Sequence, residues 1–115
     1  MRNPDNIFHL AIPCADLDAA QAYYARLGCP VARRYDDRIT LNFFGDQVVC
    51  HLCPEGIDSE PKIYPRHFGV NFRQRGDFDA LLEKATTQGL RFFREPFVRF
   101  SGGREEHHTF FLIDP

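Results

Sequence analysis

The chain has 115 residues, 43% of them hydrophobic and 14% aromatic, which is typical of one small globular domain. The formal net charge of −2 gives no reason to expect nucleic acid or an anionic membrane as partner. No apolar run approaches the roughly 20 residues of a membrane helix, and the first residues lack a signal-peptide pattern. We therefore expect a cytoplasmic protein whose partner is a small-molecule substrate.

The first expected elements are a strand followed by a helix. In residues 7–12, a period of two places Phe8, Leu10 and Ile12 on one face and His9 on the other. Residues 16–28, DLDAAQAYYARLG, read as a helix with an N-cap at Asp16, a terminating Gly28, and an apolar stripe comprising Leu17, Ala20, Tyr24 and Leu27. The stripe is expected to cover the apolar strand face, so His9 points away from the helix.

Three more strands follow the helix, over residues 31–35, 39–44 and 47–52, joined by turns at Asp36-Asp37 and Gly45-Asp46. Residues 6–53 therefore form a βαβββ unit. Cys50 and Cys53 make a CxxC at the end of this unit, but there is no second CxxC, and along a strand they would point to opposite faces. Together with Cys14 and Cys29 they are interpreted as reduced thiols, and buried thiols are favoured over a zinc or redox site.

A second copy of this unit follows a Pro-rich linker at residues 54–65. Residues 77–89, DFDALLEKATTQG, match 16–28 with an N-cap candidate at Asp77, and HFGVNF at 67–72 matches the first strand. Strands are expected at 91–97 and 107–113, and the fourth strand of this unit is expected beyond Pro115. The predicted fold is a single α+β domain over residues 1–115: two βαβββ units packed around a cupped mixed sheet, with unit two (66–115) lacking its last strand.

The histidines on these strands are candidate metal ligands. His9 and His67 occupy equivalent first strands, so pseudo-twofold packing would bring them toward each other, and His51 lies on the last strand of unit one. Although a single strand histidine is more often an ordinary core or surface residue, three neutral imidazoles on rigid strands suit divalent iron, manganese, nickel or zinc. A fourth ligand is expected on the strand beyond Pro115.

Other polar residues are candidates for a substrate pocket. Asn71 and Arg73 share the parity of His67 and could bond a substrate or a ligand imidazole. His107 and His108 alternate across a strand, so only one can face the cup, and we assign His107 to the pocket. For Tyr23 and Tyr24, inside the first helix, packing is favoured over catalysis.

The runs FHLAIPCADLDAAQAYYARLGC, HFGVNF and HHTFFLIDP resemble the vicinal oxygen chelate superfamily, the group of glyoxalase I, bleomycin-resistance proteins and extradiol dioxygenases. The resemblance implies paired βαβββ units, metal positions at His9, His51 and His67, and commonly a homodimer. It also implies a metal-dependent lyase, isomerase or dioxygenase acting on a small substrate that chelates the metal through vicinal oxygens. The alternatives are a metal-independent binding or sequestering protein of the bleomycin-resistance type, and a structural or regulatory partner.

Overall fold

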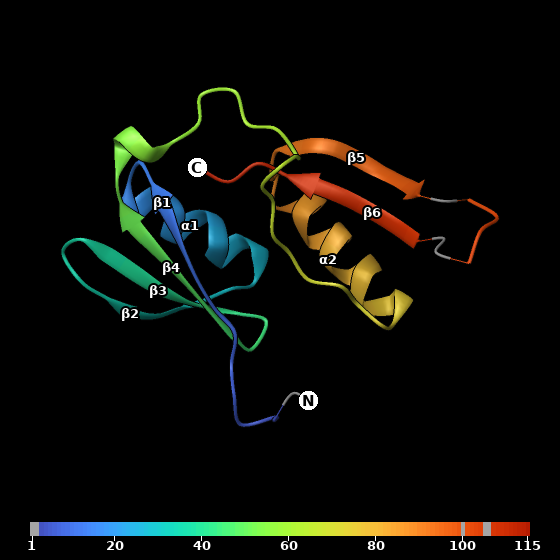
Figure 1. The fold of residues 1–115 in the computed structure, drawn as a ribbon, viewed down its shortest axis with the longest axis horizontal. Helices are drawn as coiled ribbons and strands as arrows, with labels where there is room; N and C mark the ends of the chain where they lie inside the picture. The colour runs from blue at the N-terminus through green and yellow to red at the C-terminus, as the bar shows by residue number, and fades with distance from the viewer. Residues whose placement is uncertain (1–2, 100, 105–106) are drawn as a thin grey trace.

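The structure of the protein is a computed structural model, and it describes residues 3–99, 101–104 and 107–115. It consists of two units arranged side by side along the longest axis (Figure 1). Unit one contains β1 (His9–Cys14), α1 (Leu17–Leu27), β2 (Val31–Arg34), β3 (Arg38–Phe43) and β4 (Asp46–Leu52). After a short 3-10 turn, η1 (Pro54–Gly56), unit two contains α2 (Arg75–Thr87), β5 (Phe92–Arg99) and β6 (His107–Leu112).

The strands form a four-stranded mixed sheet and a two-stranded sheet. The larger sheet has the order β1-β4-β3-β2, in which β1 runs parallel to β4 and the remaining neighbours are antiparallel. The smaller sheet is the antiparallel pair β5-β6. The α+β class and the strand-helix-hairpin order of unit one are therefore confirmed.

Helix α1 begins and ends where its sequence predicts. The Asp16 carboxylate accepts a hydrogen bond from the Ala19 N–H at 2.8 Å, and Gly28 ends the helix with a φ of +96°. The predicted stripe is buried: Leu17, Ala20, Tyr24 and Leu27. It packs in one core with buried residues of β3 and β4: Ile39, Leu41, Val48 and Cys50. Tyr23 is also buried, so both tyrosines have the packing environment expected for them.

Helix α2 begins at Arg75, so the predicted N-cap at Asp77 is wrong. The capping residue is Gln74, whose side chain makes no capping bond, and Asp77 lies inside the first turn. Two contacts of the extra residues favour the earlier start. The Arg75 Nε lies 2.8 Å from an Asp79 carboxylate oxygen, and its guanidinium lies 5.5 Å from the Phe78 ring centroid.

The strand predicted at residues 67–72 is also wrong, because this segment pairs with no strand in the described part of the chain. Its counterpart β1 is held by parallel pairing with β4. The alternation of side chains nevertheless persists, since Phe68 packs on Phe43 (centroids 5.5 Å apart) and Phe72 on Phe44 (5.9 Å). Aromatic contacts with the β3–β4 turn therefore hold the segment in place of a strand ladder.

Two further expectations concern thiols and membranes. The four cysteines are free; Cys14, Cys29 and Cys50 are buried, and Cys53 is half-buried. Burial raises the pKa of the Cys29 thiol to about 11 and that of Cys50 to about 12, which keeps both protonated near neutral pH. Neither helix within the described ranges has the length and apolarity needed to cross a membrane.

Candidate functional site

The side of the larger sheet that faces away from α1, which we call the open face, carries two of the predicted metal ligands. On β1, Leu10 and Ile12 pack toward the core while His9 is exposed on the opposite side. The strand register aligns His9 with Gln47, and His51 with Pro13 on one side and Arg38 on the other. Because aligned residues point to the same side of a sheet, all of these side chains lie on the open face.

The His9 ring is oriented by a hydrogen bond to a neighbouring strand. Its Nδ1 lies 2.6 Å from the Gln47 side-chain oxygen Oε1. Because that oxygen accepts, Nδ1 carries the proton of the neutral ring, and the lone pair is left on Nε2. A histidine whose Nδ1–H is bonded to an oxygen and whose Nε2 is unprotonated is the usual form of a metal ligand.

His67 is prepared in the same way on unit two. Its Nδ1 lies 2.8 Å from the backbone carbonyl oxygen of Ile63, which can only accept, so the neutral ring again has its lone pair on Nε2. The ring is flanked edge-on by Tyr64 (centroids 5.7 Å apart) and Phe111 of β6 (5.4 Å). The donor chemistry of both histidines therefore fits a divalent metal.

The structure does not bring the three predicted ligands together in one chain. His51 is exposed on the open face, but it lies four register positions from His9, which is roughly 13 Å along the strands. His67 belongs to the other unit. Among the described residues, no three histidine, cysteine, aspartate or glutamate side chains form a group that could hold a metal ion.

The predicted pocket residues lie on unit two. Asn71 and Arg73 are exposed, and neither side chain has a hydrogen bond or ion pair to another described residue. The His108 ring lies 6.4 Å from that of Phe78 on α2, so His108 faces the helix. His107, opposite Arg99 in the ladder, points to the other side of the β5–β6 sheet.

An aromatic surface beside His67 was not anticipated. The Phe111 ring, which contacts His67, stacks on Phe97 with centroids 6.3 Å apart, and the Arg94 guanidinium lies 3.5 Å from the Phe97 centroid. Arg94 and Phe97 share a face only because the β5–β6 register shifts between them. A simple period-two count along β5 therefore places them on opposite faces, and the sequence gives no signal for this surface.

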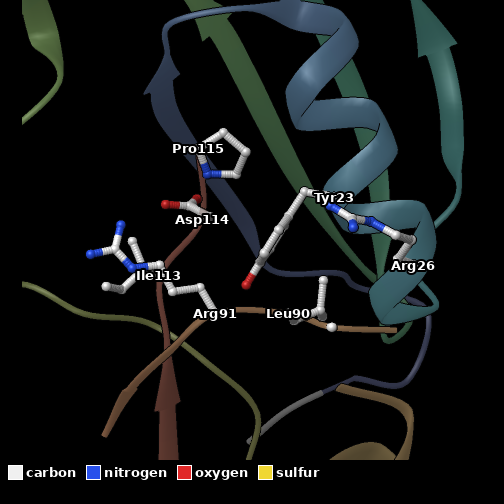
Figure 2. A pocket seen from close by; sticks show the side chains of 8 residues that line it. Tyr23, Arg26, Leu90, Arg91, Ile113, Asp114 and Pro115 are labelled. Atoms are coloured by element: carbon white, nitrogen blue, oxygen red, sulfur yellow. The ribbon is translucent and has the colours of Figure 1, made fainter. Parts of the chain in front are cut away.

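A hollow at the junction of the two units contains none of the predicted site residues (Figure 2). Tyr23 and Arg26 of α1 line it from unit one, and Arg91 and Asp114 line it from unit two. Burial, and next the Asp114 carboxylate, raises the pKa of the Tyr23 hydroxyl well above its usual range. The tyrosine is therefore held protonated, which suits packing between the units rather than proton transfer.

Comparison with known proteins agrees with this architecture. A family model described as the Glyoxalase/Bleomycin resistance protein/Dioxygenase superfamily matches residues 6–115. A glyoxalase/bleomycin resistance protein/dioxygenase from Alicyclobacillus acidocaldarius, whose crystal structure is known, is 56% identical, with a TM-score of 0.95 over 100% of this chain and 87% of that one. No curated protein matches the chain.

More distant structures share the fold alone. A lactoylglutathione lyase from Agrobacterium tumefaciens is 14% identical, with a TM-score of 0.64 over 99% of this chain and 89% of that one. A bleomycin resistance determinant encoded on the transposon Tn5 is 20% identical, with a TM-score of 0.65 over 96% of this chain and 89% of that one. With the family model matching nearly the whole chain, the protein belongs to the glyoxalase/bleomycin resistance protein/dioxygenase superfamily.

Proposed function

We propose that the protein is a metal-dependent enzyme, a lyase, isomerase or dioxygenase, acting on a small substrate that presents neighbouring oxygens to a divalent metal. The observation that carries the proposal is the shared preparation of His9 and His67, whose Nδ1–H groups are bonded to Gln47 and to the Ile63 carbonyl. Both histidines expose the Nε2 lone pair that a metal requires.

The proposed ligands of each metal are His9 and His67, and a second chain supplies the arrangement that one chain lacks. His51 lies roughly 13 Å from His9 on the same sheet and is therefore outside this centre. The open face belongs to unit one. The surface formed by His67 with Phe111 and Phe97, which we call the His67 surface, belongs to unit two. The two units extend to either side of the junction between them (Figure 1). In a symmetric homodimer, the open face of one chain can meet the His67 surface of its partner, and the converse contact follows from the symmetry. We therefore propose two equivalent sites, each formed from both chains.

The chemistry proposed for the bound metal is that of a Lewis acid polarising the substrate oxygens, and iron, manganese, nickel and zinc all suit an imidazole set. The chain's own residues orient the ligands and the substrate. Gln47 and the Ile63 carbonyl fix the two rings, and the aromatic surface of Phe111 and Phe97 offers an apolar wall beside His67. Such a wall excludes water from one side of the bound substrate.

Metal uptake tests the proposal. The protein is freed of metal with a chelator and titrated by calorimetry with Zn²⁺ and Mn²⁺, and the His9→Ala and His67→Ala variants are titrated in parallel. We expect both substitutions to weaken binding of the metal at least tenfold. His108→Ala is the matched control, because this histidine faces α2 and is expected to leave uptake unchanged. Equal uptake by all four proteins would refute the proposal.

A metal-independent binding protein is the second candidate, and an exposed apolar groove favours it. Phe8, Phe43, Phe44 and Phe68 line this groove near the β3–β4 turn, and Phe8 remains 59% exposed. Exposed aromatic surface of this kind suits an apolar ligand. Tight binding of a ligand in excess chelator, without turnover, would support this candidate over the enzyme.

A further inference from the structure

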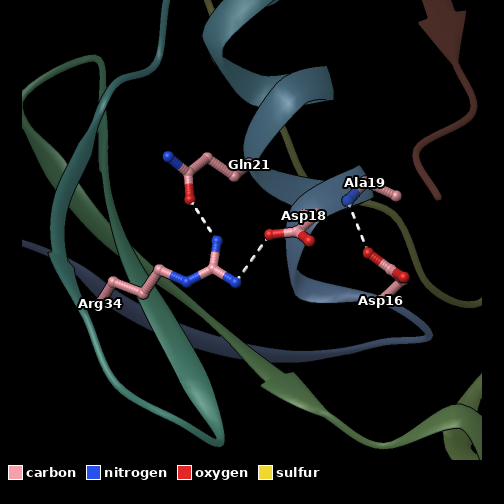
Figure 3. A network of polar contacts seen from close by, with 5 residues as sticks. All are labelled: Asp16, Asp18, Ala19, Gln21 and Arg34. Atoms are coloured by element: carbon pink, nitrogen blue, oxygen red, sulfur yellow. Dashed lines mark hydrogen bonds and ion pairs between the residues drawn. The ribbon is translucent and has the colours of Figure 1, made fainter.

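Three arginines of the β2–β3 hairpin point to two different sides of the sheet. Arg34 is aligned with the buried Ile39 and faces α1, where its Nη2 lies 2.7 Å from Asp18 Oδ1 and its Nη1 donates to Gln21 Oε1 at 2.6 Å (Figure 3). Arg33 is aligned with Thr40 and therefore lies on the open face, as Arg38 does. One arginine thus ties the hairpin to the helix, and two lie on the face that carries His9 and His51.

The two arginines of the open face have few partners of their own. Arg38 Nη1 lies 2.9 Å from Asp37 Oδ1, but the two side chains are 38% and 70% exposed, and an ion pair so open to water contributes little. The Arg38 guanidinium also lies 4.4 Å from the Tyr35 ring centroid, which holds its plane. The Arg33 side chain has no hydrogen bond or ion pair to any residue that the structure describes.

The spacing of Arg33 and Arg38 would allow both side chains to bind one oxyanion. Arg33 lies opposite Thr40, two positions along β3 from Arg38, so the two arginines are diagonal neighbours whose Cα atoms are about 7–8 Å apart. Like charges this close on one sheet face repel each other, and an anion between them removes the repulsion. A guanidinium also matches a carboxylate or phosphate with two parallel N–H donors.

This pair of arginines adjoins His51 on the open face. Arg38 is directly aligned with His51 on the neighbouring strand, so a group that contacts His51 is within reach of the Arg38 side chain. We propose that Arg33 and Arg38 form an oxyanion subsite beside His51, and that the substrate carries a carboxylate or phosphate at the end remote from its metal-binding oxygens. The subsite's place in the reaction rests on the proposed function, whereas anion binding by the arginines needs no metal.

The test uses metal-free, ¹⁵N-labelled protein and follows the arginine Nε–H signals by NMR. Glycolate and inorganic phosphate are titrated separately, with the neutral amide glycolamide as the uncharged counterpart of glycolate. We expect both anions to shift the Arg33 and Arg38 signals, and glycolamide to leave them in place. Arg33→Gln and Arg38→Gln should each weaken the binding about tenfold, the loss expected for one charge-assisted pair. The anion that binds more tightly identifies the substrate group.

Arg34→Gln is the matched control, because Arg34 is on the same hairpin and faces the helix. It should leave anion binding unchanged, and the ¹⁵N backbone spectra of the variants should match that of the parent. Equal shifts with glycolamide, equal shifts with chloride at the same ionic strength, or an equal loss in Arg34→Gln would each overturn the subsite. Anion binding that survives when the metal test fails would refute the proposed enzyme and leave the subsite standing.

Discussion

The Tyr24 hydroxyl donates a hydrogen bond to Asp114 Oδ2 at 2.5 Å and thereby joins α1 to the segment that follows β6. The two residues are 90 positions apart in the sequence, so this bond links unit one directly to unit two. Burial, and next the negative charge of Asp114, raises the pKa of Tyr24 far above its usual range. The hydroxyl therefore keeps its proton and remains a donor over the physiological pH range.

Removing this donor is expected to lower the stability of the whole chain. Tyr24→Phe leaves the ring in the core and deletes only the bond to Asp114, so the free energy of unfolding should fall by about 1–2 kcal/mol in urea denaturation. Tyr23→Phe is the matched control. The Tyr23 hydroxyl makes no hydrogen bond with the described residues, and its loss should change the stability by less than about 0.5 kcal/mol. Equal losses in both variants would argue against a specific link.

Because the pKa values of two buried thiols are raised, we expect the folded chain to lose stability in alkali. Burial raises the pKa values of Cys29 and Cys50 to about 11 and about 12, above the ordinary thiol value of 9.0, so the unfolded chain loses these protons before the folded chain does. Stability from these groups is fully present below pH 9 and falls as the pH rises from 9 toward 12, by up to about 1.4 kcal/mol per pH unit for each thiol. Tyr23 and Tyr24 add the same trend above pH 10.

Urea denaturation at pH 7, 8, 9 and 10 measures this dependence. Cys50→Ala should show a shallower decline than the parent above pH 9, whatever its stability at pH 7. An unchanged slope in this variant would mean that Cys50 is not the titrating group.

The capping of the two helices gives a paired prediction. Asp16→Ala removes the acceptor for the Ala19 N–H and should cost about 1 kcal/mol of unfolding free energy. Asp77→Ala should cost less, about 0.5 kcal/mol, because Asp77 interacts only with the dipole of the first turn of α2. Chemical denaturation of both variants measures the difference, and a larger loss in Asp77→Ala would contradict the observed start of α2.

These helices also show what the sequence can and cannot predict. The bounds of α1 follow from local signals, an N-cap and a C-terminal glycine around an apolar stripe. The start of α2 does not, because Gln74 makes no capping bond and the Asp77 signal lies inside the helix. Residues 67–72 have a strand pattern, yet strand formation depends on a partner elsewhere in the chain, which local alternation does not specify.

The candidate site likewise combines features that the sequence predicts with features that it does not. Alternation places His9 and His51 on the open face, and the structure agrees. The contact between His9 and Gln47, however, depends on the parallel register of β1 with β4, and the nearness of Arg38 to His51 depends on the antiparallel register of β3 with β4. Registers are set by packing between distant segments, so neither partner could be assigned from one sequence.

The role of Gln47 can be tested through metal affinity. Gln47→Leu removes the acceptor that fixes the His9 tautomer, and the affinity for Zn²⁺ should fall about 10–100-fold in calorimetry. Gln47→Glu keeps an oxygen acceptor at Nδ1 and should retain most of the affinity. If both variants bind Zn²⁺ as the parent does, Gln47 does not orient a metal ligand.

The most direct test of the central claim is anomalous X-ray diffraction from crystals of the full chain grown with Zn²⁺, recorded at the zinc edge. We predict a peak bonded to Nε2 of His9 and Nε2 of a His67, at about 2.0–2.1 Å from each nitrogen. A zinc peak distant from both rings, or bonded through Nδ1, would contradict the proposed metal centre.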